Sequence, residues 1–229
     1  MPKNNNPVLI SGLYSDSKKV LSKIPHKTIR EINESLIINQ NYRSDIIVLA
    51  GDDVCSEILS KIGLIPKKNF SDAPEFIKNN SVHLMKHWMC IWAVREYDEF
   101  VWIDWDTIQI KTLDKFFFEY CRKYNTPKFI YIKKYWAKVN CGVYYSNINW
   151  LEKMELGLSS LDSETNDELC WSKVLPNNLD LDQRYWWGDL IINIWDKKDL
   201  NKITKNTYFI HVKDFSLYND VKKHILNLS

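Results

Sequence analysis

Glycine is scarce in this chain, with only six glycines among 229 residues. None of them forms a Gly-x-Gly-x-x-Gly run or a Gly-x-x-x-x-Gly-Lys-Ser/Thr run. Those two runs are the fingerprints of dinucleotide binding and of P-loop phosphate binding. The sequence therefore lacks the signal for either of these two classes of nucleotide chemistry.

The chain also lacks paired cysteines. Its five cysteines are odd in number, widely spaced and without a Cys-x-x-Cys pair; they are Cys55, Cys90, Cys121, Cys141 and Cys170. This pattern favours reduced thiols over a disulfide framework or a structural zinc site.

Neither a strong net charge nor a long apolar run is present. Lysine and arginine number 31 and aspartate and glutamate 29, so the formal net charge is +2. No bulk field attracts nucleic acid or acidic lipid. No window approaches the roughly 18 apolar residues of a membrane-spanning helix, and the apolar run 8–10 is too short for a signal peptide. We expect a soluble, cytoplasmic protein with no nucleic-acid partner and no transmembrane segment.

What the chain does contain is an ordinary globular composition, 45% hydrophobic and 26% charged. The length suits one domain over residues 1–229. Apolar runs bounded by turn residues alternate with stretches of helical periodicity. They predict strands over 7–13, 45–50, 99–103, 128–132, 139–146 and 207–212, and helices over 27–40, 54–62, 82–97, 186–195 and 217–226.

This alternation predicts an α/β fold with a mixed, mostly parallel sheet flanked by helices. In such sheets the ligand lies beyond the carboxyl ends of the strands. The residues after positions 13, 50, 103 and 146 are therefore the first places to look for a functional site.

The strongest local feature is a pair of aspartates, Asp104 and Asp106, directly after the apolar strand over 99–103. Two carboxylates at a strand end can reach one hard cation such as Mg²⁺ or Mn²⁺, which prefers oxygen ligands and keeps positions for substrate phosphates. Aspartate is also common in solvated turns. The apolar residues before the pair and its place midway along an α/β chain favour the functional interpretation.

Four segments in this order resemble the GT-A fold glycosyltransferases, in particular glycogenin-like and lipopolysaccharide-type enzymes that use nucleotide-diphosphate sugars. They are the helix HLMKHWMCIWAVREYDEF with VWIDWDT after it, the strand VNCGVYYSN, the segment WGDLIIN and the late strand IHV. The resemblance covers most of the chain, from Val8 to about Lys213. It implies a Rossmann-like GT-A domain.

The resemblance also implies roles for individual residues. Metal ligands would be Asp104, Asp106 and His211, although the glycine usual soon after this histidine is missing. Lys86 would face the diphosphate. The remaining contacts to the donor would come from Ser11, Gly12, Leu13 and Tyr14 at the base and ribose, Trp105 between the aspartates, and Asn140 and Gly142 near the sugar.

Asp189 is the candidate catalytic residue. Many glycogenin-like enzymes carry Asp-Gln before the corresponding helix, whereas this chain has Gly188-Asp189. A carboxylate there could deprotonate an acceptor hydroxyl as a general base, as in inverting transferases. We therefore favour inversion at the transferred sugar.

The predicted reaction needs a metal cofactor and two substrates. Negative charge builds on the leaving diphosphate, and Mn²⁺ or Mg²⁺ would act on it as a Lewis acid. The predicted donor is a UDP-sugar or GDP-sugar, with UDP preferred. The predicted acceptor is a hydroxyl of a glycan, a lipid or a glycoprotein.

Three other interpretations stay open at this point. A haloacid-dehalogenase-type phosphatase also uses Asp-x-Asp after a strand, but its motif lies near the N-terminus and its later acidic motif would end in Asn193. A nucleotidyltransferase would need a glycine-rich, arginine-bearing loop where 11–15 has none. The third is a non-catalytic module that binds a sugar or a nucleotide.

Overall fold

The computed structural model describes residues 6–14, 46–61, 63–79, 82–131, 139–159, 166–177, 179 and 182–228. The helix predicted over 27–40 lies outside the described residues. All five cysteines are buried, and none of them forms a disulfide in the part of the chain that the structure describes. None of the helices within the described ranges combines the length and apolarity that crossing a bilayer needs.

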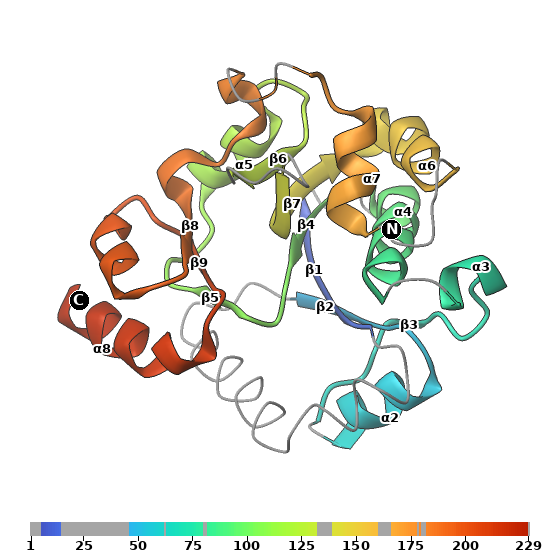
Figure 1. The fold of residues 1–229 in the computed structure, drawn as a ribbon, viewed down its shortest axis with the longest axis horizontal. Helices are drawn as coiled ribbons and strands as arrows, with labels where there is room; N and C mark the ends of the chain where they lie inside the picture. The colour runs from blue at the N-terminus through green and yellow to red at the C-terminus, as the bar shows by residue number, and fades with distance from the viewer. Residues whose placement is uncertain are drawn as a thin grey trace.

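A six-stranded sheet forms the centre of the fold, in the order β3-β2-β1-β4-β7-β6 (Figure 1). The four strands β3, β2, β1 and β4 run parallel, and β7 and β6 add antiparallel pairings at one side. The mixed, mostly parallel sheet predicted from the sequence is confirmed. Its strands are β1 (Val8–Leu13), β2 (Ile46–Ala50), β3 (Lys68–Asn69), β4 (Glu99–Ile103), β6 (Lys128–Tyr131) and β7 (Val139–Asn147).

Helices cover both faces of this sheet because successive strand residues point to opposite sides. On one face, Ile10, Trp102 and Tyr144 pack in one core with the helices α4 (Val82–Tyr97), α6 (Leu151–Ser159) and α7 (Asp167–Val174). On the other, their neighbours Leu9, Val101 and Val143 pack against α5 (Lys115–Arg122) and part of a second sheet. The continuous apolar runs of the sequence are thus strands buried on both faces.

The second sheet has three strands in the order β5-β9-β8. Its strands lie on the side of the molecule where Figure 1 marks the C-terminus. They are β5 (Thr107–Gln109), β8 (Ile191–Ile194) and β9 (Phe209–Val212). Three isoleucines of this sheet, Ile108, Ile192 and Ile210, pack against α8 (Tyr218–Leu228). The register therefore leaves His211, between Thr107 and Asn193, on the opposite face.

The helix predicted over 186–195 is wrong. Residues Gly188–Leu190 form a short 3-10 turn, η4, and Ile191–Ile194 form β8. Gly188 has φ 57°, which interrupts an α-helix, and the β-branched isoleucines after it pair with β9. The helical spacing of the apolar residues arises because both faces of β8 are largely buried.

Short elements connect these layers. They are α2 (Asp53–Lys61), α3 (Glu75–Lys78), η1 (Ile148–Trp150), η3 (Gln183–Tyr185), η5 (Lys197–Lys202) and η6 (Phe215–Leu217). The N-terminus of η5 has a capping box made by Asp196 and Asp199.

Asp199 supports a prediction about stability and pH. Burial raises the pKa of Asp199, but the ammonium of Lys202 at 2.6 Å and the N–H groups of Trp195 and Asp196 lower it, and the net shift is downward. A depressed pKa contributes stability above the unfolded pKa of about 3.9 that is lost as the pH falls through the folded pKa. We expect Asp199→Asn to lower the free energy of unfolding by about 1.5–3 kcal/mol at pH 7.

Urea unfolding at several pH values checks this prediction. The deficit of the variant should shrink as the pH falls below about 4, because the protonated aspartic acid then resembles the asparagine. A deficit that stays constant down to pH 3 would contradict the charge-based explanation.

Candidate active site

The two aspartates lie in the turn that carries the chain from the large sheet to the small one. β4 ends at Ile103, and the Asp104 N–H donates to the carbonyl of Gly142 on β7 at 2.7 Å. The Thr107 N–H closes the turn on the Asp104 carbonyl at 3.1 Å, and β5 starts there. Both carboxylates are therefore held at the carboxyl end of a parallel strand, as the sequence predicts.

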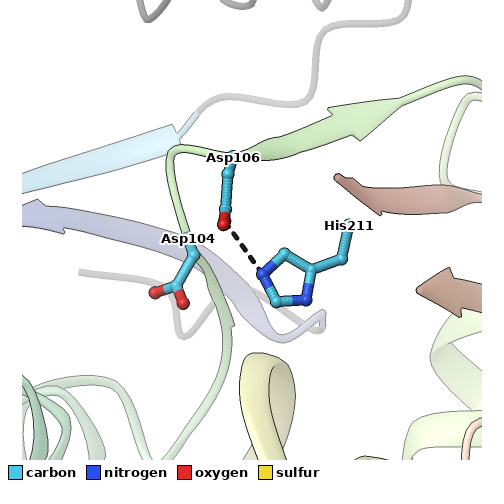
Figure 2. A group of neighbouring side chains, drawn as sticks. All are labelled: Asp104, Asp106 and His211. Atoms are coloured by element: carbon cyan, nitrogen blue, oxygen red, sulfur yellow. Dashed lines mark ion pairs between the residues drawn. The ribbon is translucent and has the colours of Figure 1, made fainter. Parts of the chain in front are cut away.

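His211 faces this turn from β9. Figure 2 shows the Asp106 side chain directed at the His211 ring, with Asp104 to one side. The Asp106 Oδ1 and His211 Nε2 atoms are 2.9 Å apart. One ligand atom from each of Asp104, Asp106 and His211 lies within 4.8 Å of the other two. The fold thus brings together the three residues predicted as metal ligands, which come from positions up to 107 residues apart.

These three residues fit a divalent cation. The Asp106 Oδ1 and His211 Nε2 atoms are buried and face each other, and within the described ranges neither has another hydrogen-bond partner. Two ligands at right angles on an ion with bonds of about 2.1 Å lie about 3 Å apart. The observed separation matches, and carboxylate plus imidazole suits Mn²⁺ as well as Mg²⁺.

The charge around Asp106 keeps it ionised. Burial raises the pKa of Asp106, but the imidazole of His211 and the ammonium of Lys213 lower it, and the net shift is downward. The Lys213 Nζ atom lies 3.6 Å from Asp106 Oδ2 and is partly exposed. Lys213 thus brings a cation to the edge of the same site.

Lys86 lies on α4, and its ammonium group contacts residues of the site. Its side chain is only 2% exposed, and its ammonium contacts Asp104 Oδ1 at 2.9 Å, Asp167 Oδ2 at 3.0 Å and the Cys141 carbonyl at 2.7 Å. Burial lowers the pKa of Lys86, but the two carboxylates raise it, and the net shift is upward. Lys86 stays charged, and each of its three N–H donors already has an acceptor, so its predicted contact with a diphosphate remains a prediction.

Asp104 is held by several donors at once. Its Oδ1 atom accepts from Trp102 Nε1 at 2.7 Å and from the Tyr14 hydroxyl at 3.3 Å, besides the contact with Lys86. Tyr14 is the last described residue after β1. The segment predicted to hold the base and ribose therefore reaches the aspartate pair.

The other residues of that segment are engaged inside the protein. The Ser11 hydroxyl donates to the Ile103 carbonyl at 2.6 Å, the Gly12 carbonyl accepts from Trp105 Nε1 at 2.7 Å, and Leu13 is buried. A Cβ at Gly12 would lie 2.8 Å from the Trp102 ring. These contacts place Trp105 against β1, and a nucleotide contact of the segment remains a prediction.

The chain is similar to known proteins at the level of its fold. No protein-family profile and no curated protein matches the sequence. Solved structures match the fold. The glycosyltransferase involved in the glycosylation of the major capsid of PBCV-1 has a TM-score of 0.53 at 15% identity, over 96% of this chain and 99% of that one.

Two further structures agree. Mouse xyloside xylosyltransferase 1 has a TM-score of 0.54 at 6% identity, over 90% of this chain and 97% of that one. The galactosyltransferase LgtC, in complex with donor and acceptor sugar analogues, has a TM-score of 0.51 at 9% identity, over 96% of this chain and 95% of that one. The fold is that of the GT-A glycosyltransferases.

The GT-A domain places Asn140 and Gly142 beside the cluster, on β7. The Asn140 side chain donates to Glu168 Oε1 at 2.7 Å and accepts from the Gly142 N–H at 3.2 Å. A Cβ at Gly142 would lie 1.9 Å from His211 Cε1. The glycine therefore leaves space for the imidazole ring, and Asn140 links the cluster to Glu168.

Glu168 is a site residue that sequence reasoning missed, together with Asp167 before it. Both lie in the first turn of α7, after the N-cap residue Asn166. Burial raises the pKa of Glu168 and the charge of Asp167 raises it further, against smaller lowering effects of Lys86 and Lys213. Acidic residues at a helix start usually complement the helix dipole, so the sequence contained no distinct signal for them.

Asp189 lies elsewhere in the GT-A domain. Its side chain is exposed in η4, and its carbonyl accepts from the Thr207 hydroxyl. A cleft of about 330 Å³ runs alongside, between β6 and β8, but Asp189 does not line it. The residues that do are Ile130, Gln183, Trp186, Trp187, Gly188, Ile191, Ile192, Asn193 and Lys202.

Proposed function

We propose that this chain is a metal-dependent glycosyltransferase that moves a sugar from a nucleotide-diphosphate donor, a UDP-sugar first of all, to a hydroxyl acceptor. The observation that carries the proposal is the group of Asp104, Asp106 and His211 at the strand ends of a GT-A fold, in which two buried ligand atoms face each other and have no other hydrogen-bond partner among the described residues. The proposed cofactor is Mn²⁺ or Mg²⁺, held by these three residues.

Leaving-group stabilisation is the first chemical task. A bound divalent cation would supply a Lewis acid for the charge that develops on the diphosphate. Among the described residues, Lys213, partly exposed and 3.6 Å from Asp106, is a cation well placed to contact a phosphate oxygen directly. Lys86 acts on the leaving group indirectly, because its ammonium contacts the carboxylate of Asp104 and holds that carboxylate in place.

Proton removal from the acceptor is the second task, and it underlies the proposal of inversion. Two carboxylates compete for this role. Asp189 is exposed and can take up a proton from solvent-accessible acceptors. Glu168 is linked through Asn140 and Gly142 to the His211 side of the cluster, and its raised pKa brings it nearer the range of a general base.

The acceptor itself would enter through the cleft between β6 and β8. Its volume of about 330 Å³ suits a sugar-sized ligand. Its wall includes Asn193, which contacts His211. The Asn193 side chain therefore separates the cleft from the group of Asp104, Asp106 and His211. A glycan, a lipid-linked sugar or a glycoprotein can each present a hydroxyl in this way.

The phosphatase interpretation loses support from the same contacts. Asp104 would be its nucleophile, but Lys86, Trp102 and Tyr14 all contact the Asp104 carboxylate. A carboxylate held by three donors is poorly suited to attack phosphorus.

Thermal shift with UDP-, GDP- and CMP-sugars, each with and without Mn²⁺, tests the proposal. A donor at about 100 times its Kd adds about 2.7 kcal/mol, which corresponds to roughly 5–10 °C for a domain of this size. We expect one nucleotide to give such a shift only when Mn²⁺ is present. The absence of any shift across the panel would contradict the proposal.

A matched pair of substitutions decides which carboxylate is the base. We expect Glu168→Gln to leave the donor-induced thermal shift unchanged and to lower kcat by about 10²–10⁴-fold, because a glutamine accepts no proton. Asp189→Asn, which removes an exposed carboxylate, is the comparison. Steady-state transfer rates and the anomeric proton coupling of the product are the readouts.

Either result is informative. A large loss of kcat in Asp189→Asn with full activity in Glu168→Gln would restore Asp189 as the base. A product that retains the anomeric configuration would overturn the proposal of inversion.

A further inference from the structure

The register of the small sheet places Asn193 directly beside His211. β8 and β9 run parallel, with Asn193 opposite His211 and Ile192 opposite Ile210. Paired residues on neighbouring strands point to the same face. The Asn193 side chain therefore lies alongside the imidazole ring, while both isoleucines point to the core under α8.

The contact between the two side chains is a short hydrogen bond. His211 Nδ1 lies 2.7 Å from Asn193 Oδ1. A carboxamide oxygen only accepts, so Nδ1 must carry the proton. With the proton on Nδ1, Nε2, the atom 2.9 Å from Asp106 Oδ1, is the nitrogen whose lone pair would bind a divalent cation.

The ring has little freedom to leave this orientation. His211 is fully buried. Gly142 leaves so little space that a Cβ there would lie 1.9 Å from Cε1 and 2.4 Å from each ring nitrogen. A contact below 3 Å cannot be accommodated without displacing the ring. Asn193 is thus the polar group at Nδ1, whereas Asp106 faces Nε2.

We infer that Asn193 is a positioning residue of this site, which holds His211 as the Nδ1–H tautomer with Nε2 directed at the position of a divalent cation. The inference rests on the proposed metal-dependent function. A second hydrogen bond on the far nitrogen is the usual way in which proteins orient a metal-binding histidine and strengthen it as a ligand. The inference makes β8, which the sequence analysis assigned to a helix, part of the metal site.

Asn193 has a second consequence for the cleft between β6 and β8. Its Nδ2 atom is buried and, among the described residues, has no hydrogen-bond partner. The same side chain lines the cleft. A ligand oxygen that enters the cleft can therefore accept from Nδ2 while Oδ1 keeps its hold on His211.

Two measurements test the inference, the first with Mn²⁺ itself as the probe. The Mn²⁺ affinity, from the EPR signal of the free ion, should fall about 10–100-fold in Asn193→Leu, which has similar size but no acceptor. Asn193→Asp keeps an oxygen at the same place and should stay within a few-fold of the parent protein. Ile194→Val, on the same strand but buried in the core under α8 and outside the cleft, is the control for disturbance of β8.

Nitrogen NMR of histidine side chains, recorded on the parent protein and on Asn193→Leu with Mg²⁺ as a diamagnetic probe, is the second measurement. We expect His211 in the parent protein to show the Nδ1–H tautomer, and in Asn193→Leu to lose this preference. An Nε2–H tautomer in the parent protein, or an unchanged Mn²⁺ affinity in Asn193→Leu, would overturn the inference while leaving the proposed function intact. Failure of the parent protein to bind Mn²⁺ would overturn both.

Discussion

Asp106→Asn is expected to remove the Mn²⁺-dependent part of donor binding and to lower the transfer rate by about 10²–10³-fold. The carboxylate of Asp106 is the group in contact with both His211, at 2.9 Å, and Lys213, at 3.6 Å. An asparagine keeps the size of the side chain but removes the charge that a divalent cation needs. Mn²⁺ titration by EPR and the thermal shift with donor measure the loss.

A surface aspartate supplies the matched control for Asp106. Asp72→Asn removes the same charge from an exposed side chain that pairs with Lys68 at the far edge of the sheet. We expect this variant to bind Mn²⁺ and donor like the parent protein. Equal Mn²⁺ affinity in Asp106→Asn and Asp72→Asn would remove Asp106 from the metal site.

Gly142→Ala is expected to be the most damaging change of a single methyl group in the described part of the site. The new Cβ would lie 1.9 Å from His211 Cε1, so the ring must move. Forced overpacking in a well-packed interior costs about 1–3 kcal/mol, and the displaced Nε2 no longer faces Asp106. Thermal unfolding and Mn²⁺ titration should therefore both show a loss.

The double variant Gly142→Ala with His211→Ala separates the two effects. Removing the ring relieves the clash, so the melting temperature should recover part of its loss, while Mn²⁺ binding stays absent. A single Gly142→Ala variant with the melting temperature and Mn²⁺ affinity of the parent protein would show that the ring is not held as described.

Much of the architecture could be predicted from the sequence, for reasons that lie in single segments. The residues 82–97 include large apolar side chains at helical spacing, such as Leu84, Trp88 and Trp92, and the structure has a helix with the same bounds, α4. The run over 99–103 is apolar and bounded by charged residues, and it is β4. Such segments are decided locally, because each buries its apolar side chains in any compact α/β arrangement.

The segment 186–195 shows where local information ended. Its apolar residues have a spacing compatible with a helix, but Ile191–Ile194 pair with β9 and are buried on both sides. Strand pairing between residues 18 positions apart is a tertiary event, so the pattern within the segment could not predict it. Asn193 acquired its contact with His211 only through this pairing.

The sequence by itself determined the aspartate pair and its setting. Asp104 and Asp106 had to lie at a strand end, because an apolar strand precedes them and their charges exclude them from its interior. The same local logic placed Asn140 and Gly142 on a buried strand and His211 on a late one. The resemblance carried by these segments was sufficient to predict the GT-A fold.

Only the tertiary structure decided which other residues join them. Glu168 at the start of α7 and Lys213 after β9 have the sequence context of a helix start and a solvated turn. They reach the site because α7 packs on β7 and β9 pairs with β5. Asp189, the charged residue of the segment WGDLIIN, is exposed to solvent instead of joining this group. Side-chain type and spacing report what a residue can do, whereas its neighbours in the folded chain depend on long-range packing that no single segment contains.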